Sequence, residues 1–333
     1  MSLINGGNQM FKTLIDKLKA DPKKIVFTEG TDPRILEASA RLLTSDFSTP
    51  VLVGNVDEVN AAAKAAGFNI NGAIIVDPET YDEMDAMVET MVELRKGKMT
   101  PDQCRDALSK GNYFGTMLVK MGKADCLLGG ATYSTADTVR PALQLIKTKP
   151  GNKIVSSCFI LVREGVTGGN ELLAMGDCAI NIKPSEDELV EIGIEVAKCA
   201  QIFGIDPKVA YLSYSTLGSG KGEDVDKVRN ACAKAKELAP ELDIDGELQF
   251  DAAVSPTVAK TKCPTSKVAG QANTFIFPDI NAGNIGYKIA QRLGGFAAYG
   301  PILCGLNAPI NDLSRGCDAE EVYSMAIITA ALS

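Results

Sequence analysis

The sequence predicts an α/β protein built from two three-layer domains, each with a mostly parallel sheet. Short apolar runs alternate with amphipathic stretches along the chain, which is the pattern of strands joined by helical crossovers. The length of 333 residues is enough for two hydrophobic cores. A polar segment with a Pro-Gly dipeptide, residues 147–152, interrupts the pattern and marks a domain boundary.

The apolar runs have the length of buried strands, and the amphipathic stretches have helical periodicity. Strands are expected at residues 24–27, 51–53, 73–76, 125–128, 154–162, 209–213, 248–250, 274–277 and 301–303. Helices are expected at residues 33–43, 56–66, 81–96, 102–109, 135–146, 186–203, 223–238, 285–293 and 319–332. The helix at 186–203 has a capping-box pattern in Ser185 and Glu188 and a stop signal in Gly204.

A second crossing between the domains is expected near residues 300–309. The last helix would then return to the first domain and make the middle domain an insertion. The expected domains are therefore residues 1–147 plus 304–333 and residues 148–303.

Histidine is absent from the sequence. This absence excludes Ser-His-Asp and Cys-His catalysis and any histidine-liganded metal, so a general base must be a carboxylate, Lys, Tyr or Cys. The nine cysteines are scattered and form no CxxC pair. Buried thiols in a reducing compartment are therefore expected in place of disulfides or a zinc site.

The formal net charge of −8 argues against binding to nucleic acid or to anionic membranes. No apolar stretch approaches the roughly twenty residues of a membrane-spanning helix. The first residues are polar and do not resemble a signal peptide. We expect a cytoplasmic protein, whose basic residues must gather locally if its substrate is an anion.

The first candidate site is segment 134–141, which follows a Gly-Gly turn at the end of an expected strand. Ser134 and Thr135 place hydroxyls at the start of a helix, and Arg140 follows within that helix. Hydroxyls, backbone N–H groups and an arginine at a helix start suit a phosphate group. A helix cap with a surface arginine explains the same residues equally well.

The second candidate site is segment 311–321, a polar turn before the final helix. Arg315 has the paired N–H donors that grip phosphate, and Ser314 has a hydroxyl that can donate to an oxyanion. Glu321 is a candidate base. The structural alternative is that Asp318 and Glu321 form a capping box, and the pattern alone favours this alternative.

Two glycine-bearing segments are weaker candidates. Residues 283–288 are expected to form a turn with Asn284, leading into a helix that carries Arg292, and residues 217–222 a flexible loop that could act as a lid. Neither has the spacing of a Walker A or dinucleotide-binding motif. Packing of helices against strands explains their glycines without a ligand.

Four blocks of sequence resemble, in order, those of the phosphate acetyltransferase (phosphotransacetylase) family: residues 112–117, 134–141, 283–292 and 311–317. The resemblance extends from about residue 24 to the C-terminus. It implies reversible transfer of acetyl from acetyl-CoA to phosphate, giving acetyl phosphate and CoA. It also implies a fold similar to isocitrate and isopropylmalate dehydrogenases with the active site in the interdomain cleft, a homodimer, and no metal or organic cofactor.

The same resemblance assigns roles to single residues. Arg315 matches the arginine that holds acetyl phosphate, and Ser314 matches the serine that stabilises the tetrahedral state. Arg95 and Arg140 match arginines of the CoA site, and Arg292 matches a further arginine of the cleft. The expected catalytic set is Ser314, Arg315 and Glu321, and the expected substrate-binding set is Arg95, Ser134, Thr135, Arg140, Asn284 and Arg292.

Glu321 departs from the family, which usually has Asp at this position and uses it to deprotonate the CoA thiol. Glu keeps the carboxylate but changes its reach by one methylene, so the capping-box alternative stays open. We expect direct transfer in a ternary complex. The alternative is a covalent acyl-cysteine on Cys317, whose thiol pKa a neighbouring Arg315 and a helix N-terminus would lower.

Three rival functions follow from the same resemblance. Phosphate butyryltransferase is a related acyltransferase for longer chains. A non-catalytic phosphotransacetylase-like module, as found fused behind malic enzyme, would have a regulatory role. A nicotinamide-dependent dehydrogenase of the same fold would need metal-binding aspartates and a cofactor loop, and the sequence has no matching set.

Overall fold

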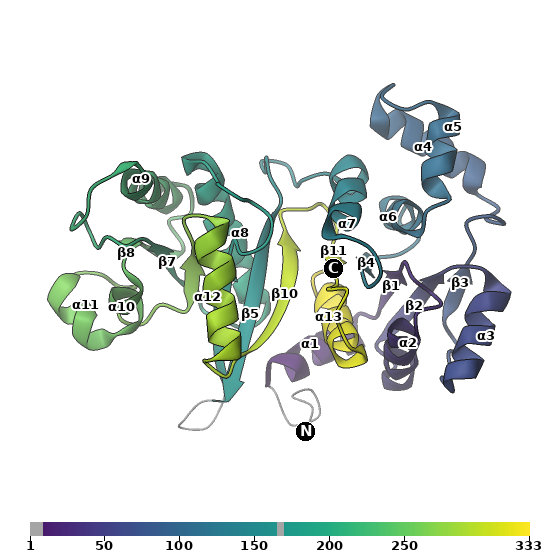
Figure 1. Cartoon of the computed structure of the whole chain (residues 1–333), viewed down its shortest axis with the longest axis horizontal. Coiled ribbons are helices and arrows are strands. Elements are labelled where there is room, and N and C mark those ends of the chain that lie inside the picture. The colour runs from purple at the N-terminus through teal and green to yellow at the C-terminus, as the bar shows by residue number, and fades with distance from the viewer. Residues whose placement is uncertain (1–8, 165–169) are drawn as a thin grey trace. The chain divides into compact units, whose positions relative to one another are not determined.

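The computed structural model describes residues 9–164 and 170–333. The chain folds into two compact units. The first unit comprises the chain up to Lys149 together with Leu306–Ser333, and the second comprises Pro150–Gly305. The last part of the chain therefore completes the sheet of the first unit, as its yellow helix α13 (Ala319–Ala331) and strand β11 (Ile310–Asp312) show (Figure 1).

The first unit contains a five-stranded, fully parallel sheet in the order β11-β4-β1-β2-β3. Its other strands are β1 (Lys23–Phe27), β2 (Ser48–Val53), β3 (Ile74–Val76) and β4 (Cys126–Gly129). Its other helices are α1 (Gln9–Ala20), α2 (Pro33–Ser45), α3 (Val56–Ala66), α4 (Met84–Arg95), α5 (Pro101–Leu108), α6 (Gly111–Lys120) and α7 (Thr135–Pro141), with the π-helix η1 (Ala142–Ile146). From β1 the chain proceeds to β2 on one side and later to β4 on the other, so the gap between β1 and β4 is a topological switch point.

The second unit contains a six-stranded mixed sheet in the order β10-β5-β6-β9-β7-β8. The pairs β10-β5 and β5-β6 are antiparallel, and the remaining pairs are parallel. Its strands are β5 (Ser156–Glu164), β6 (Asn170–Gly176), β7 (Lys208–Leu212), β8 (Asp243–Leu248), β9 (Thr274–Ile276) and β10 (Ala297–Cys304). Its helices are α8 (Glu186–Ile202), α9 (Glu223–Leu238), α10 (Phe250–Val254), α11 (Pro256–Lys262) and α12 (Ile280–Arg292).

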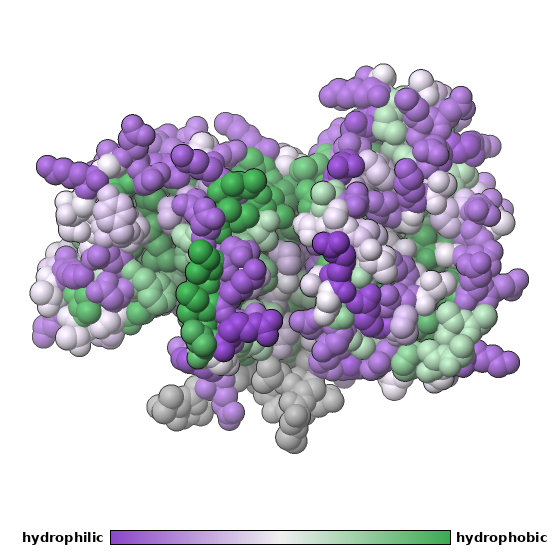
Figure 2. Space-filling model, in the orientation of Figure 1, coloured by the Kyte–Doolittle hydropathy of each residue, from purple (hydrophilic) through white to green (hydrophobic). Residues whose placement is uncertain are grey.

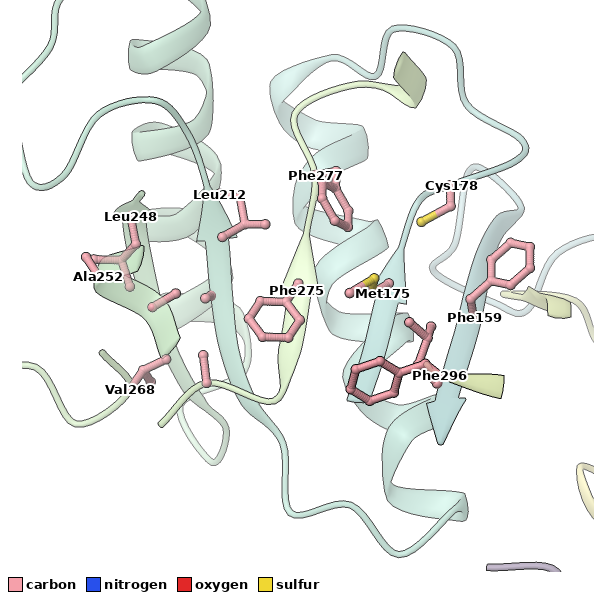
Figure 3. Close-up of a cluster of buried hydrophobic side chains, with 14 of the residues drawn as sticks. Phe159, Met175, Cys178, Leu212, Leu248, Ala252, Val268, Phe275, Phe277 and Phe296 are labelled. Atoms are coloured by element: carbon pink, nitrogen blue, oxygen red, sulfur yellow. The ribbon is translucent and has the colours of Figure 1, made fainter. Parts of the chain in front are cut away.

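The core of the second unit is rich in aromatic side chains. Phe159, Met175, Leu212 and Phe275, from four neighbouring strands, belong to one buried cluster (Figure 3). Phe277, just after β9, and α12 complete part of this layer, where Tyr287 stacks on Phe159 at a ring-centroid distance of 4.1 Å. Burial of such side chains is the main favourable contribution to folding.

The predicted α/β class with mostly parallel strands is confirmed. Local signals predicted several elements well: α3 and α9 begin and end at the expected residues. Both hydrogen bonds of the Ser185–Glu188 capping box are formed, and Gly204 has a left-handed φ of 78°.

Other expected elements are wrong. The expected strand at 248–250 ends at Leu248, and Phe250 begins a helix; β8 lies earlier, in a stretch whose Asp and Gly are unfavourable in strands. The expected turn at 283–288 lies inside α12. The expected helix 135–146 changes at Pro141 into a π-helix, because proline supplies no backbone N–H.

Several elements were not predicted. They include β6, whose Leu, Ala and Met favour helix in isolation, so that pairing with β5 and β9 decides its conformation. The other unpredicted elements are α1, α6, α10, α11 and β11. Within residues 9–164 and 170–333, no helix combines the length and the apolar character that crossing a membrane requires.

Gly283→Ala is predicted to destabilise the protein, although alanine favours helix over glycine. A Cβ at Gly283 would lie 2.4 Å from the carbonyl oxygen of Asp177, and overpacking of this kind costs roughly 1–3 kcal/mol. Thermal unfolding followed by circular dichroism should show a lower melting temperature. Asn281→Ala, at an exposed position of the same helix, is the control; an equal loss in both variants would contradict the packing argument.

Candidate active site

Polar residues gather at the carboxyl ends of three adjacent strands in the first unit. Thr28 and Glu29 follow β1, Gly130 follows β4, and Asp312 ends β11. Since β4 lies between β1 and β11 in the sheet, these residues share one edge. Ligands of open α/β sheets bind at this edge, next to the topological switch point.

The turn from Ser314 to Cys317 follows β11 directly. The Cys317 N–H donates to the Ser314 carbonyl oxygen over 2.9 Å, and the Gly316 N–H donates to Ser314 Oγ over 3.3 Å. The side chains of Ser314 and Arg315 are exposed. Ser314 Oγ accepts a hydrogen bond here, so its own hydrogen remains available to a ligand.

Arg34 holds this turn from the start of α2. Its Nη1 donates to the carbonyl oxygens of Arg315 and Cys317 over 3.0 and 3.1 Å. Its Nη2 donates to the Ala131 carbonyl oxygen over 3.0 Å and to Asp32 Oδ2 over 2.7 Å. The Arg34 side chain lowers the pKa of Asp32, so this carboxylate stays ionised beside the guanidinium.

Asp312 is a buried carboxylate, with 2% of its surface exposed. It accepts hydrogen bonds from Thr135 Oγ1 over 2.6 Å and from Thr138 Oγ1 over 2.5 Å. Burial raises its pKa, although both hydroxyls and the charge of Arg315 favour the ionised form. Gly130, at φ 98°, makes room for the carboxylate, because a Cβ there would lie 2.3 Å from Asp312 Oδ1.

Glu29 holds the same loop from the β1 side. Its Oε1 accepts from the N–H groups of Gly130 and Thr132 over 3.0 and 3.2 Å, and its Oε2 accepts from Thr28 Oγ1 over 2.7 Å. Thr28 donates its only proton to Glu29, so the Tyr133 hydroxyl, at 2.8 Å, donates to Thr28. Burial raises the pKa of Glu29 above its ordinary value.

Sequence reasoning missed the roles of Arg34, Glu29 and Asp312. The available signal was the run Asp32-Pro33-Arg34 just after an expected strand, which marks a helix start that carries an arginine. Asp312 lies in the second candidate segment, 311–321, but its residue type alone does not distinguish it from an exposed carboxylate. Burial, which distinguishes Asp312, is not readable from its neighbours in sequence.

The predicted residues of α7 are occupied by internal contacts. Ser134 Oγ donates to Asp137 Oδ2 over 2.6 Å and thereby lowers the pKa of Asp137. Thr135 donates to Asp312, as described above. Neither hydroxyl can donate to a phosphate without losing its hydrogen bond to the carboxylate of Asp137 or Asp312. Arg140 is exposed in the last turn of the helix, near Asp137.

Arg95 ends α4 and is half-buried. Its Nε is buried and has no hydrogen-bond partner among residues 9–164 and 170–333. A buried guanidinium N–H without a partner is costly, and an anionic group of a ligand would satisfy it.

In the second unit, Asn284 donates to the Cys178 carbonyl oxygen over 3.0 Å from the first turns of α12. Arg292 is exposed at the end of the same helix. The loop at 217–222 is not the loose lid that its glycines indicated. Buried Glu247 accepts from the Gly218 N–H over 2.7 Å and from Ser215 Oγ over 2.9 Å, and thereby anchors it.

Glu321 forms the capping box that the sequence left as an alternative. Its N–H donates to Asp318 Oδ1 over 2.8 Å, and its Oε2 accepts from the Asp318 N–H over 3.2 Å. The side chain is exposed at the start of α13. The cap is therefore real, and the role of Glu321 as a base stays a prediction.

Cys317 differs from the sequence expectation. Burial raises the pKa of its thiol to about 11, against the opposing charge of Arg34. The arginine in contact with its sulfur is Arg34, at 3.7 Å, and the thiol stays protonated at neutral pH. The expectation of a lowered thiol pKa is therefore wrong. In the described part of the chain, no group of three or more His, Cys, Asp or Glu side chains is placed to hold a metal ion.

Comparison with known proteins shows the family of the chain. Residues 9–330 match the model of the phosphate acetyl/butaryl transferase family. The chain belongs to this family. A phosphate acetyltransferase of Bacillus subtilis is 54% identical over 322 residues, which cover 97% of this chain and 98% of that protein. A phosphate acetyltransferase of Staphylococcus epidermidis is 50% identical over 327 residues, again with 97% and 98% coverage.

Solved structures of the family have the same fold. A phosphotransacetylase from Streptococcus pyogenes has a TM-score of 0.94 at 53% identity, covering 97% of this chain and 98% of that chain. The EutD phosphotransacetylase from Staphylococcus aureus has a TM-score of 0.91 at 49% identity with the same coverage. A branched-chain phosphotransacylase from Enterococcus faecalis shares the fold at a TM-score of 0.65 and 21% identity, covering 93% of this chain and 99% of that chain.

Arg34→Gln is predicted to loosen the turn that carries Ser314 and Arg315. Glutamine cannot supply the donors that bind two turn carbonyls and Ala131 together. Cys317, 6% exposed, should then react roughly tenfold faster with iodoacetamide, because exposure relieves the burial that raises its thiol pKa, and this effect is larger than the loss of the Arg34 charge. Peptide mass spectrometry measures the rate. Arg41→Gln is the control, because Arg41 lies on the same helix but pairs with Glu320 and Tyr323; equal acceleration would contradict the clamp.

Asp312→Asn is predicted to change how stability depends on pH. The folded-state pKa of Asp312 is raised, so its protonated form favours folding; this contribution is full below the unfolded pKa and is lost as pH rises through the folded pKa. Asparagine removes that loss. The melting temperature of the variant relative to wild type should therefore rise from acidic to neutral pH. A constant or falling difference would contradict the raised pKa.

Proposed function

We propose that this chain is a phosphate acetyltransferase, which converts acetyl-CoA and phosphate reversibly into acetyl phosphate and CoA. The relatives named above, at 50–54% identity, support the reaction. The structural observation that carries it is the Ser314–Cys317 turn. Its backbone is fixed by Arg34, while the side chains of the consecutive residues Ser314 and Arg315 stay exposed.

In the phosphate-consuming direction, a phosphate oxygen attacks the thioester carbonyl carbon. The carbonyl oxygen becomes an oxyanion, which the Ser314 hydroxyl stabilises by donating a hydrogen bond. Arg315 orients the phosphate and offsets the repulsion between its charge and the oxyanion. The C–S bond then breaks, and the leaving CoA sulfur takes up a proton, which reverses the proton transfer from the thiol described next. None of these steps needs a metal or an organic cofactor, since phosphate is itself an anionic nucleophile.

In the reverse direction, the CoA thiol is the nucleophile. With a pKa of about 8.5 it is mostly protonated at neutral pH. We assign Glu321 as the base that takes this proton as sulfur attacks the carbonyl carbon of acetyl phosphate. The C–O bond to phosphate then breaks, and phosphate leaves. The capping box uses its backbone N–H and Oε2, which leaves Oε1 for the thiol proton.

The remaining predicted residues are proposed to bind the anionic groups of CoA and phosphate. The arginines Arg95, Arg140 and Arg292 supply charge, and the Nε of Arg95, which has no hydrogen-bond partner in the part of the chain that the structure describes, supports this role for Arg95. Ser134 and Asn284 are proposed to act as polar contacts; Ser134 would exchange its bond to Asp137, which is less buried than Asp312, for one to a substrate oxygen. Transfer is proposed to be direct in a ternary complex, because the buried, protonated Cys317 is a poor nucleophile.

Phosphate-dependent cleavage of acetyl-CoA by the purified protein tests the proposed function. Loss of the thioester absorbance should require phosphate or arsenate and should fall severely in Arg315→Gln. No cleavage would favour a non-catalytic member of the family. Butyryl-CoA must be compared, since the family model covers acetyl and butaryl transferases; a faster rate with butyryl-CoA would favour the butyryl enzyme.

Glu321→Gln is predicted to lower kcat far more than KM for CoA. The amide cannot accept the thiol proton, but glutamine keeps the capping box, because its carbonyl oxygen can accept from the Asp318 N–H. Steady-state kinetics with acetyl phosphate and CoA measure the effect. Asp318→Asn, which also keeps a cap, is the control with normal turnover. A lower melting temperature with unchanged kcat would leave Glu321 as a cap only.

The protein is further proposed to be a homodimer. Helix α12 and its C-cap residue Leu293 present an exposed apolar stripe (Figure 2). The stripe consists of Ile285, Ile289 and Leu293, which are 58%, 54% and 85% exposed. The stripe borders an apolar cavity of about 710 Å³ over the sheet of the second unit, with Met175 and Phe275 in its wall. A stripe and a groove on one face can pair reciprocally with a second copy, as two-fold symmetry requires.

Ile289→Lys is predicted to shift the protein toward monomer, because it places a charge in this apolar face. Sedimentation velocity over a concentration series measures the shift. Leu238→Lys, on α9 and 71% exposed, is the control and should leave assembly unchanged. A wild-type monomer, or a dimer unaffected by Ile289→Lys, would contradict the proposal.

We also propose that the enzyme acts in the cytoplasm, since its nine cysteines are buried free thiols.

A further inference from the structure

Helix α7 and strand β11 are joined by a pair of short hydrogen bonds. Thr135, the first residue of α7, and Thr138, one turn later, lie on the same face of the helix. Their hydroxyls donate to the two different oxygens of Asp312, over 2.6 and 2.5 Å. The bonds join residues 177 and 174 positions apart in the chain.

The residues around Asp312 leave room for its carboxylate and favour these two hydrogen bonds. Asp312 and Thr138 are each 2% exposed. Gly130 has no Cβ that would displace the carboxylate, and the Leu313 N–H donates to the Gly129 carbonyl oxygen over 2.7 Å. Without both hydroxyls, the buried carboxylate would lose the hydrogen bonds that offset the free-energy cost of its burial. The bonds therefore specify one position of α7 on the sheet edge.

The contact has a direct consequence for Thr135. A threonine hydroxyl has one proton, and here it is donated to Asp312. Phosphate oxygens accept hydrogen bonds, so a phosphate would have to compete with a buried anion for that proton. Thr135 is therefore poorly placed to be a substrate ligand.

We propose that Thr135, Thr138 and Asp312 are positioning residues that hold α7, and with it Arg140, in register with the Ser314–Arg315 turn. Arg140 comes two residues after Thr138, and Ser314 comes two residues after Asp312. Displacements of about 1 Å between reacting groups can reduce rates by roughly a hundredfold. The inference rests on the proposed acetyl transfer for its catalytic consequence, and it replaces the substrate-binding role expected for Thr135.

The test compares two double variants. Thr135→Val with Thr138→Val removes both hydroxyls at constant shape, and Thr135→Ser with Thr138→Ser keeps them. The valine pair should lose roughly tenfold or more in kcat/KM for CoA, and the serine pair should stay within about threefold of wild type. Normal kinetics in the valine pair, or an equal loss in the serine pair, would overturn the proposal.

Hydrogen exchange of the α7 amides gives a readout independent of activity. The valine pair should exchange faster across residues 135–140 than wild type or the serine pair. Thr44→Val is the control: Thr44 lies in the same unit on α2 and donates to the Ala40 carbonyl oxygen over 2.8 Å, so α7 should be unaffected. If the valine pair does not fold, single Thr135→Val replaces it in both measurements.

The two readouts separate this proposal from the proposed function. A wild-type protein without acetyl-transfer activity would contradict the function, while exchange would still report whether the three residues hold α7. Unchanged exchange in the valine pair would overturn the positioning role even in a fully active enzyme.

Discussion

The segment of residues 130–138, which comprises the loop after β4 and the start of α7, is held by three charged side chains, and the candidate active site depends on this restraint. Glu29 binds its N–H groups, Arg34 binds one of its carbonyl oxygens, and Asp312 binds its hydroxyls. The three side chains come from the ends of different elements. An irregular backbone at the edge of a sheet needs such partners, because it has no ladder to satisfy its polar groups.

Arg34 extends the same restraint to the turn that carries Ser314 and Arg315. One guanidinium therefore fixes two loops, one that precedes the second unit in sequence and one that follows it. The backbone of Arg315 is bound while its side chain is exposed. Acyl transfer benefits from donors that are already in place when charge develops, since they need no reorganisation during the reaction.

Part of this structure could be predicted from the sequence and part could not. Helices with caps, such as the one that begins after Ser185, have local signals that tertiary packing did not change. The polar turn that carries Ser314 and Arg315 before a helix is visible in the local sequence, but the roles of these two residues stay a prediction. Arg34 was missed because the carbonyl of Arg315 that it binds lies 281 residues away. Periodicity and residue type say nothing about such long-range pairs.

The error at Cys317 has the same origin. The sequence shows an arginine and a helix start beside the thiol, which both favour a thiolate. It does not show that the thiol is buried, and burial outweighs the arginine and raises the pKa to about 11. The structure thereby removes the main argument for a covalent acetyl-cysteine, and the direct reaction of two bound substrates becomes the simpler mechanism.

Isotope exchange between phosphate and acetyl phosphate tests direct transfer most directly. The enzyme is incubated with acetyl phosphate and radiolabelled phosphate, first without CoA and then with a catalytic amount of CoA. Direct transfer predicts no label in acetyl phosphate until CoA is added, and rapid labelling afterwards. Labelling without CoA would show that the enzyme itself accepts the acetyl group and would contradict this account.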